Sequence, residues 1–183
     1  MKKTVVVPLA QGFEEIEAVT VIDILRRAGV EVIVAGVSPD PITGRNGIRL
    51  VADRPISEVK AADIDMVVLP GGAQGTEYLA KCASTQQLLK DSAARGKYLA
   101  AICAAPTVLS GLGLIDGKRV TSHPSVETKL GKVSYSDHRV VIDGNVITSR
   151  SPGTAMEFAM ALVEILAGKE KAGEINKGVL ARL

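Results

Sequence analysis

Cys103 lies at a point in the sequence where a thiol is often reactive. It follows an apolar, strand-like run, Tyr98 to Ile102, and precedes a predicted helix over Ala104 to Ser110. A nucleophile at such a turn projects beyond the strand, and backbone N–H groups at a helix start stabilise a thiolate or an oxyanion. The helix dipole also lowers the pKa of a thiol there. Cys103 is therefore the candidate nucleophile, with a buried packing cysteine as the alternative.

Glu17 is the candidate acid that would work beside this thiol. On a predicted helix over residues 14–28 it shares an apolar stripe with Val21, Ile24 and Ala28. Burial raises the pKa of a carboxyl group, and a protonated glutamate next to a thiolate can donate a hydrogen bond and shuttle a proton. The alternative is that Glu17 only complements the helix N-terminus, which is what we expect of its acidic neighbours at positions 14 and 15.

Other residues with possible chemistry are fewer and less specific. Gly71 and Gly72 follow a strand end, where glycines let backbone N–H groups approach a ligand, although a plain tight turn is equally common there. His123 is the leading base candidate of the two histidines, and His138 has the context of a loop residue. Cys82 falls within a predicted helix, and we interpret it as a packing residue.

Short apolar runs that alternate with helical patterns must position these groups. Such alternation predicts βαβ units and a mostly parallel sheet with helices on both faces, and ligands then bind beyond the carboxyl ends of strands, here in the loops 10–15, 70–75 and 103–106. The predicted strands are Val5–Val7 (ended by Pro8), Val30–Val37, Met66–Leu69, Tyr98–Ile102, Arg119–Thr121 and a hairpin of Arg139–Ile142 with Asn145–Ser149. The predicted helices cover 14–28, about 75–95 as one or two helices, 104–110, 153–167 and about 170–180, and residues 39–47 form turns with a possible small hairpin.

Length and composition restrict the class of protein. The chain has 183 residues, 46% of them hydrophobic and 23% charged, which suits one globular domain over residues 1–183. A net charge of +2 and 3% aromatic residues argue against a nucleic-acid partner. No apolar run is long enough to span a membrane, and the N-terminal segment lacks the pattern of a signal peptide. We therefore expect a cytoplasmic protein with no membrane partner.

Cofactor motifs are also missing from the sequence. Two cysteines cannot make a disulfide framework or a four-thiolate zinc site. The glycine-rich stretch 111–117 does not fit a dinucleotide or phosphate-binding loop, and there is no HExxH or GxSxG sequence. We expect neither a metal nor a cofactor.

Five ordered motifs closely resemble the ThiJ/PfpI superfamily, in the branch of a parkinsonism-associated deglycase and its bacterial relatives. The resemblance covers essentially the whole chain. The motifs are Glu14-Glu15-Ile16-Glu17, Val67-Val68-Leu69-Pro70-Gly71-Gly72, Ala100-Ala101-Ile102-Cys103-Ala104-Ala105-Pro106, Thr121-Ser122-His123-Pro124 and Thr148-Ser149-Arg150-Ser151-Pro152-Gly153-Thr154.

The resemblance implies a flavodoxin-like three-layer sandwich and a homodimer. Cys103 would match the family's oxidation-sensitive nucleophile, and Glu17 the protonated glutamate that hydrogen-bonds it. Gly72 and Ala104 would supply the backbone N–H donors that face the site, with Gly71 next to them. His123 would match a nearby histidine that takes part in proton transfer.

Departures from related branches narrow the expected activity. The protease branch carries a histidine directly after the nucleophile, where this chain has Ala104, and class I amidotransferases flank their cysteine with glycines. The resemblance instead implies a glutathione-independent glyoxalase or deglycase, which converts methylglyoxal, glyoxal or their early adducts to lactate or glycolate through a cysteine hemithioacetal. The alternative is an oxidative-stress sensor or redox-regulated chaperone that uses the same cysteine.

Overall fold

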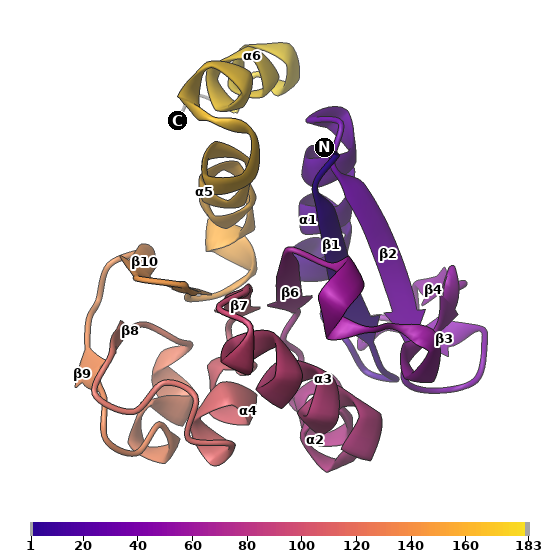
Figure 1. The fold of residues 1–183 in the computed structure, drawn as a ribbon, viewed down its shortest axis with the longest axis vertical. Helices are drawn as coiled ribbons and strands as arrows, with labels where there is room; N and C mark the ends of the chain where they lie inside the picture. The colour runs from indigo at the N-terminus through magenta and orange to yellow at the C-terminus, as the bar shows by residue number, and fades with distance from the viewer. Residues whose placement is uncertain (1, 182–183) are drawn as a thin grey trace.

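Both faces of the first strand are buried, because its side chains alternate between two hydrophobic cores. In β1 (Thr4–Leu9), Val5, Val7 and Leu9 pack into one core and Val6 into the other. A strand that is apolar on both faces requires helices above and below it. The computed structural model, which describes residues 2–181, has this α/β sandwich architecture (Figure 1) and so confirms the predicted fold class.

The central sheet has seven strands in the order β10-β11-β7-β6-β1-β2-β5. All neighbours are parallel except the hairpin of β10 with β11. The other strands of this sheet are β2 (Glu31–Gly36), β5 (Arg54–Pro55), β6 (Met66–Leu69), β7 (Tyr98–Ile102), β10 (Val140–Asp143) and β11 (Val146–Ser149). Two small pairs lie outside it: β3 (Ile42–Thr43) with β4 (Arg49–Leu50), and β8 (Arg119–Val120) with β9 (Ser134–Tyr135).

The helices form a layer on each face of this sheet. On one face, α1 (Glu15–Arg27) packs against α5 (Ala155–Ala167), and α6 (Lys169–Val179) packs on α5 (Figure 1). The other face is covered by α2 (Ala73–Lys81), α3 (Ala83–Ala94) and α4 (Pro106–Gly111). Short 3-10 turns occupy Ile56–Glu58, Ala61–Asp63, Pro124–Lys129 and Pro152–Thr154. Residues 75–95, for which the sequence predicts one or two helices, belong to the two helices α2 and α3. The possible small hairpin over residues 39–47 is observed as β3 and β4, with its second strand at residues 49–50.

Three local predictions were wrong, each for a physical reason. Pro8 does not end the first strand: β1 pairs with β6 only over Val5 and Val6, so Pro8 lies beyond that ladder and stays paired with Ala35 of β2. The helix after Cys103 begins at Pro106, not at position 104. Cys82 lies between α2 and α3 instead of inside a helix, and it packs partly against the second core.

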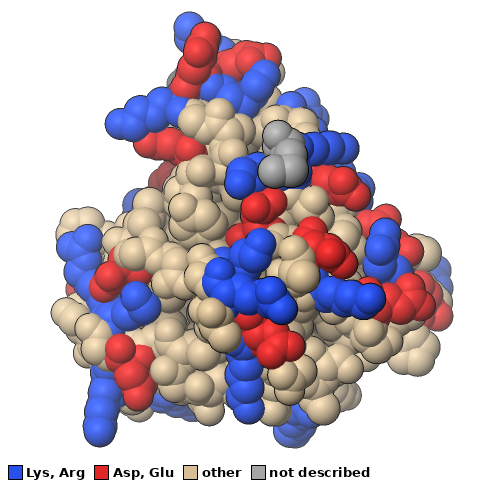
Figure 2. Space-filling model, viewed as in Figure 1, with Lys and Arg blue, Asp and Glu red and all other residues tan. Residues whose placement is uncertain are grey.

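Charged side chains of both signs lie next to one another on the surface. Figure 2 shows basic and acidic groups interspersed over the face in view. Several form ion pairs, such as Arg27 with Asp23 and Lys3 with Asp65. None of the helices in the described part of the chain is long and apolar enough to cross a membrane.

Candidate active site

The candidate site is assembled at the carboxyl ends of three adjacent strands. β7, β6 and β1 are neighbours and run parallel, so the segments that follow Ile102, Leu69 and Leu9 meet at one edge of the sheet. These are the loops that the sequence predicted. They carry Cys103, the Gly71-Gly72 pair and the start of α1.

Cys103 occupies a constrained turn at the end of β7. Its φ is 65°, a left-handed conformation that is uncommon for a residue with a side chain and costs on the order of 1–2 kcal/mol. Two backbone hydrogen bonds hold the turn: the Cys103 N–H donates to the Ser149 carbonyl at 3.0 Å, and the Cys103 carbonyl accepts from the His123 N–H at 2.9 Å. The turn therefore fixes the direction of the thiol.

Backbone N–H groups of Gly72 and Ala104 both donate to the Cys103 thiol. Gly72 has a φ of 89°, and a Cβ there would lie 2.4 Å from the Gly12 carbonyl oxygen, so only glycine allows the two loops to approach this closely. The structure thus brings together Gly72, Ala104 and Cys103, the three residues that the family resemblance groups at one site.

Glu17 lies directly beside this thiol. Its side chain is fully buried on the apolar face of α1, and Oε2 accepts the Gly71 N–H at 2.8 Å. Oε1 is also buried and has no hydrogen-bond partner within the described part of the chain. The Cys103 side chain interacts with this carboxyl group and lowers its pKa. A Cβ at Gly71 would lie 2.6 Å from Oε2 and 2.7 Å from the Cys103 Cβ, so glycine there makes the contact possible.

Burial raises the pKa of Glu17 to about 7. The Gly71 N–H opposes this shift, whereas the negative charge of Glu14 adds to it. Glu14 is held close because its carboxylate caps α1 and accepts the Glu17 N–H at 2.8 Å. The expectation for Glu14, a helix-capping acid, is confirmed. Glu17 is instead a buried acid that changes its charge near neutral pH.

The pKa of Cys103 is raised as well, to about 12, first by burial and then by the charge and hydrogen bond of Glu17. This result corrects the expectation that the helix start lowers it. The Ala104 and Gly72 N–H groups do lower the pKa of Cys103, but α4 begins only at Pro106. Burial and the ionised Glu17 carboxylate beside the thiol outweigh these two donors. Above about pH 7 the Glu17–Cys103 pair therefore carries one negative charge, which lies on Glu17, and a proton that moves from Sγ to Glu17 creates the thiolate.

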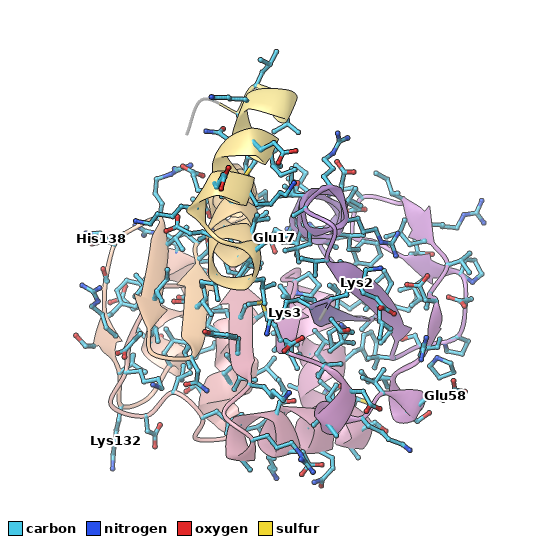
Figure 3. The ribbon with its side chains drawn as sticks, turned by 45° about the horizontal axis from the view of Figure 1, so that its top comes forward. Lys2, Lys3, Glu17, Glu58, Lys132 and His138 are labelled. Carbon is cyan, nitrogen blue, oxygen red and sulfur yellow. The ribbon has the colours of Figure 1, made fainter. Side chains whose placement is uncertain are left out.

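His123 is adjacent to the site through its backbone. Its ring Nδ1 accepts the Ser125 N–H at 3.2 Å and lies 2.8 Å from the Ser125 hydroxyl, so the neutral ring carries its proton on Nε2. Within the described chain, no hydrogen bond joins the imidazole to Cys103 or Glu17. His138 lies at the periphery, far from Glu17 in Figure 3, where it contacts Ser136. No cluster of metal-ligating side chains is found in residues 2–181.

Glu15 has a role that the sequence did not reveal. Its buried carboxylate reaches the β3–β4 hairpin and accepts hydrogen bonds from the Asn46 N–H at 2.6 Å, the Asn46 Nδ2 at 3.0 Å and the Ile48 N–H at 3.4 Å. Burial alone would raise the pKa of Glu15, but these hydrogen bonds lower it overall. The expectation that Glu15 only complements the helix N-terminus is therefore incomplete, because Glu15 also fixes a hairpin next to the site.

Fold and site together define an α/β protein with a cysteine at a strand-to-helix turn and a buried glutamate against its thiol. Residues 3–165 match the DJ-1/PfpI family, and the chain belongs to this family.

Similar proteins are known from plants and animals. The chain is 44% identical to Protein DJ-1 homolog A of Arabidopsis thaliana over 96% of its own length but only 45% of that protein, and 43% identical to Protein dj-1beta of Drosophila melanogaster over 98% of each. The crystal structure of the Drosophila protein superimposes with a TM-score of 0.94 at 44% identity and covers 98% of both chains. Glutathione-independent glyoxalase DJR-1.2 of Caenorhabditis elegans is 42% identical over 90% of this chain and 88% of that protein.

Proposed function

We propose that the protein is a glutathione-independent glyoxalase with Cys103 as its nucleophile. The observation that carries this proposal is the Cys103–Glu17 pair, which carries one negative charge above about pH 7 beneath the N–H groups of Gly72 and Ala104. A thiol, an acid whose pKa lies near neutral pH and two fixed donors are the groups that addition to an aldehyde requires. The name of the Caenorhabditis relative supports the same activity.

The reaction begins with proton transfer from the Cys103 thiol to Glu17. The thiolate attacks the aldehyde carbon of methylglyoxal or glyoxal, and the new oxyanion is stabilised by the Gly72 and Ala104 N–H groups. Glu17 then protonates this oxygen, which gives a neutral hemithioacetal and a carboxylate. The chemistry needs no metal, cofactor or glutathione.

Glu17 next acts as a base in the isomerisation. Its carboxylate removes the proton from the former aldehyde carbon and returns a proton to the adjacent carbon, while the hydroxyl proton of the hemithioacetal passes to the neighbouring carbonyl oxygen, so that one carbon is oxidised and its neighbour is reduced. The product is a thioester on Cys103, and water releases lactate or glycolate and restores the thiol. His123 is proposed to assist as a donor through Nε2–H, because its Nδ1 is engaged by Ser125. Deglycation of early protein or nucleotide adducts would use the same steps.

Product formation tests this proposal directly. Wild-type protein with methylglyoxal and no glutathione should form lactate over many turnovers, and Cys103→Ser should form none while it remains folded. Lactate is the appropriate readout because any exposed amine or thiol consumes methylglyoxal without catalysis. Continued lactate formation by the Ser variant would refute Cys103 as the nucleophile.

A redox sensor or redox-regulated chaperone is the second candidate. The observation that favours it is the surroundings of the thiol, because the Gly72 and Ala104 N–H groups and a protonated Glu17 could all hydrogen-bond a sulfinate. Peroxide should then add two oxygens at Cys103 before Cys82 reacts. Peptide mass spectrometry that found the reverse order would exclude this candidate.

Homodimer formation and a cytoplasmic location also remain proposals. Exposed apolar side chains on α1 and the β3–β4 hairpin support self-association: Ile16, Val19, Ile48 and Val51. Light scattering should give twice the monomer mass, and a monomer at micromolar concentration would contradict the proposal.

A further inference from the structure

Two hydroxyl side chains are buried at the end of β11, which begins with apolar residues. Val146 and Ile147 start the strand, Thr148 and Ser149 end it, and all four are buried. A buried hydroxyl group costs free energy unless it is hydrogen-bonded, and an apolar side chain of the same size would fill the space without that cost. The Ser149 hydroxyl donates to the Arg139 carbonyl at 2.8 Å. The Thr148 hydroxyl has a different partner, closer to the candidate active site.

Thr148 holds the segment that follows β8. Its Oγ1 accepts the Thr121 N–H at 2.9 Å, and neither residue is exposed to solvent. Because side chains alternate along a strand, Thr148 lies on the same face of the sheet as Val146, and Val120 of β8 belongs to the hydrophobic core on that face. The hydroxyl group thus ties the end of β11 to the chain that leads from β8 to the site.

These two segments are the ones that hold the turn at Cys103. The carbonyl of Ser149, the residue after Thr148, accepts the Cys103 N–H at 3.0 Å. The N–H of His123, two residues beyond Thr121, donates to the Cys103 carbonyl at 2.9 Å. The Thr148 hydroxyl therefore closes a ring of three hydrogen bonds that runs through both backbone groups of Cys103.

The turn needs this support because the backbone of Cys103 is strained. Its φ of 65° lies in the left-handed region, which a residue with a side chain keeps only where the surrounding structure fixes it. The Cys103 Cβ and Glu17 Oε2 lie 2.7 Å and 2.6 Å from the place that a Cβ at Gly71 would take, so the two side chains are neighbours. A turn that relaxed would move the thiol away from Glu17.

We propose that Thr148 is a positioning residue for Cys103, whose hydroxyl group keeps the strained turn in the conformation that presents the thiol to Glu17. The inference rests on Cys103 as the nucleophile of the proposed glyoxalase, and it extends that function to a residue outside the reacting groups. A role in packing alone needs only the volume of the Thr148 side chain, whereas a positioning role needs its oxygen atom.

The test separates these two roles with four side chains at position 148. Thr and Ser carry the hydroxyl group, whereas Val has the volume of Thr without it and Ala lacks only the oxygen of Ser. Lactate formation from methylglyoxal should stay within about twofold of wild type in Thr148→Ser and fall about tenfold or more in Thr148→Val and Thr148→Ala, because displacement of a catalytic group by about 1 Å costs up to about a hundredfold.

Thr85→Val is the matched control. The Thr85 side chain is fully buried, and its hydroxyl group has no hydrogen-bond partner among residues 2–181, so this variant makes the same change where no contact is lost. It should form lactate at the wild-type rate. Circular dichroism shows which variants are folded, and if Thr148→Val is not, Thr148→Ser and Thr148→Ala make the same comparison.

Alkylation of Cys103 by iodoacetamide gives a second readout that does not depend on turnover. Burial and Glu17 raise the pKa of this thiol to about 12, so a relaxed turn should lower it. The rate at the Cys103 peptide, measured by mass spectrometry at pH 8, should rise about tenfold in Thr148→Val, the effect of a thiol pKa lower by about one. It should be unchanged in Thr148→Ser and in Thr85→Val.

The two readouts distinguish failure of this inference from failure of the proposed function. Variants that group by volume, with Thr148→Val like wild type and Thr148→Ser like Thr148→Ala, would overturn the inference and leave the glyoxalase proposal intact. An alkylation rate in folded Thr148→Val equal to that of wild type would also overturn it. No lactate from wild type would refute the glyoxalase proposal, and a higher alkylation rate in Thr148→Val would then still support Thr148 as the residue that positions the thiol.

Discussion

Substitution of Glu17 by Gln should make the protein more stable at pH 8 while it removes the proposed activity. The Gln amide keeps an oxygen for the Gly71 N–H, which donates to Glu17 at 2.8 Å, and it cannot ionise. The variant should gain stability because wild type must hold the charge of the buried Glu17 carboxylate at high pH, and burial of that charge costs free energy.

The magnitude follows from the two protonation equilibria. In the unfolded chain the carboxyl group has its ordinary pKa of 4.5, and in the fold burial raises it to about 7. Below pH 4.5 Glu17 is protonated in both the folded and the unfolded chain, and the free energy of unfolding is not reduced by this group. Between pH 4.5 and about 7 the folded state keeps the proton that the unfolded state has lost, so stability falls as the pH rises. At about 1.4 kcal/mol per pH unit, the loss above pH 7 is about 3 kcal/mol.

The assay is urea unfolding of wild type and Glu17→Gln at pH 5 and at pH 8. The difference in unfolding free energy between the two proteins should grow in favour of the variant by about 2–3 kcal/mol from the lower to the higher pH. Cys103→Ala serves as the control and should keep most of the wild-type pH dependence, because burial is the main cause of the Glu17 shift. A difference that is the same at both pH values would refute a raised pKa for Glu17.

Three further predictions follow from the same geometry. Gly71→Ala should reduce turnover at least about a hundredfold, because the new Cβ would lie 2.6 Å from Glu17 Oε2 and a displacement of a catalytic group by about 1 Å has an effect of that size. Gly178→Ala is the control and should leave turnover unchanged, because no atom lies within 4 Å of a Cβ there. Equal activity in the two variants would contradict this prediction. Asn46→Ala should lower the free energy of unfolding by about 1–2 kcal/mol, because the buried Glu15 carboxylate loses a donor at 3.0 Å, and thermal unfolding at neutral pH measures this. The kcat/KM for methylglyoxal should rise with pH and level off above about pH 7, where the Cys103–Glu17 pair has lost its first proton; a flat profile between pH 5 and 8 would contradict this charge on the pair.

The fold could be predicted from the sequence because its signals are local. A β-branched run such as Val5–Val7 and a helical apolar stripe such as that of Glu17, Val21 and Ile24 are visible within a few residues, and all of these are buried as predicted. The order of β7, β6 and β1 then brings their loops to one edge. The loops that carry Gly72 and Cys103 could therefore be assigned to one site from the sequence, and the resemblance to the ThiJ/PfpI superfamily implied Glu17 beside the thiol.

The remaining features of the site depend on contacts between distant residues. Glu15 and Asn46 are 31 positions apart, and nothing near either residue marks it as a partner of the other. The direction of the Cys103 pKa shift could not be predicted either, because it depends on whether a carboxylate or only backbone donors face the thiol. The exact start of α4 was missed for a similar reason: the left-handed turn at Cys103 is held by Ser149 and His123, which come much later in the sequence.

The covalent step on Cys103 and the proton step on Glu17 can be tested together by intact-mass spectrometry with methylglyoxal. In Glu17→Gln the carboxylate whose charge and hydrogen bond raise the pKa of Cys103 is gone, so the thiolate can form without Glu17 and add to the aldehyde. The base for the isomerisation is missing, so the protein should accumulate a single adduct with the mass of methylglyoxal and release no lactate. Peptide mapping should place this adduct on Cys103, and residue 103 should carry no adduct in the double variant Glu17→Gln with Cys103→Ser. Wild type should form lactate and show little adduct. An adduct of the same yield in the double variant, or undiminished lactate from Glu17→Gln, would contradict the proposed roles of Cys103 and Glu17.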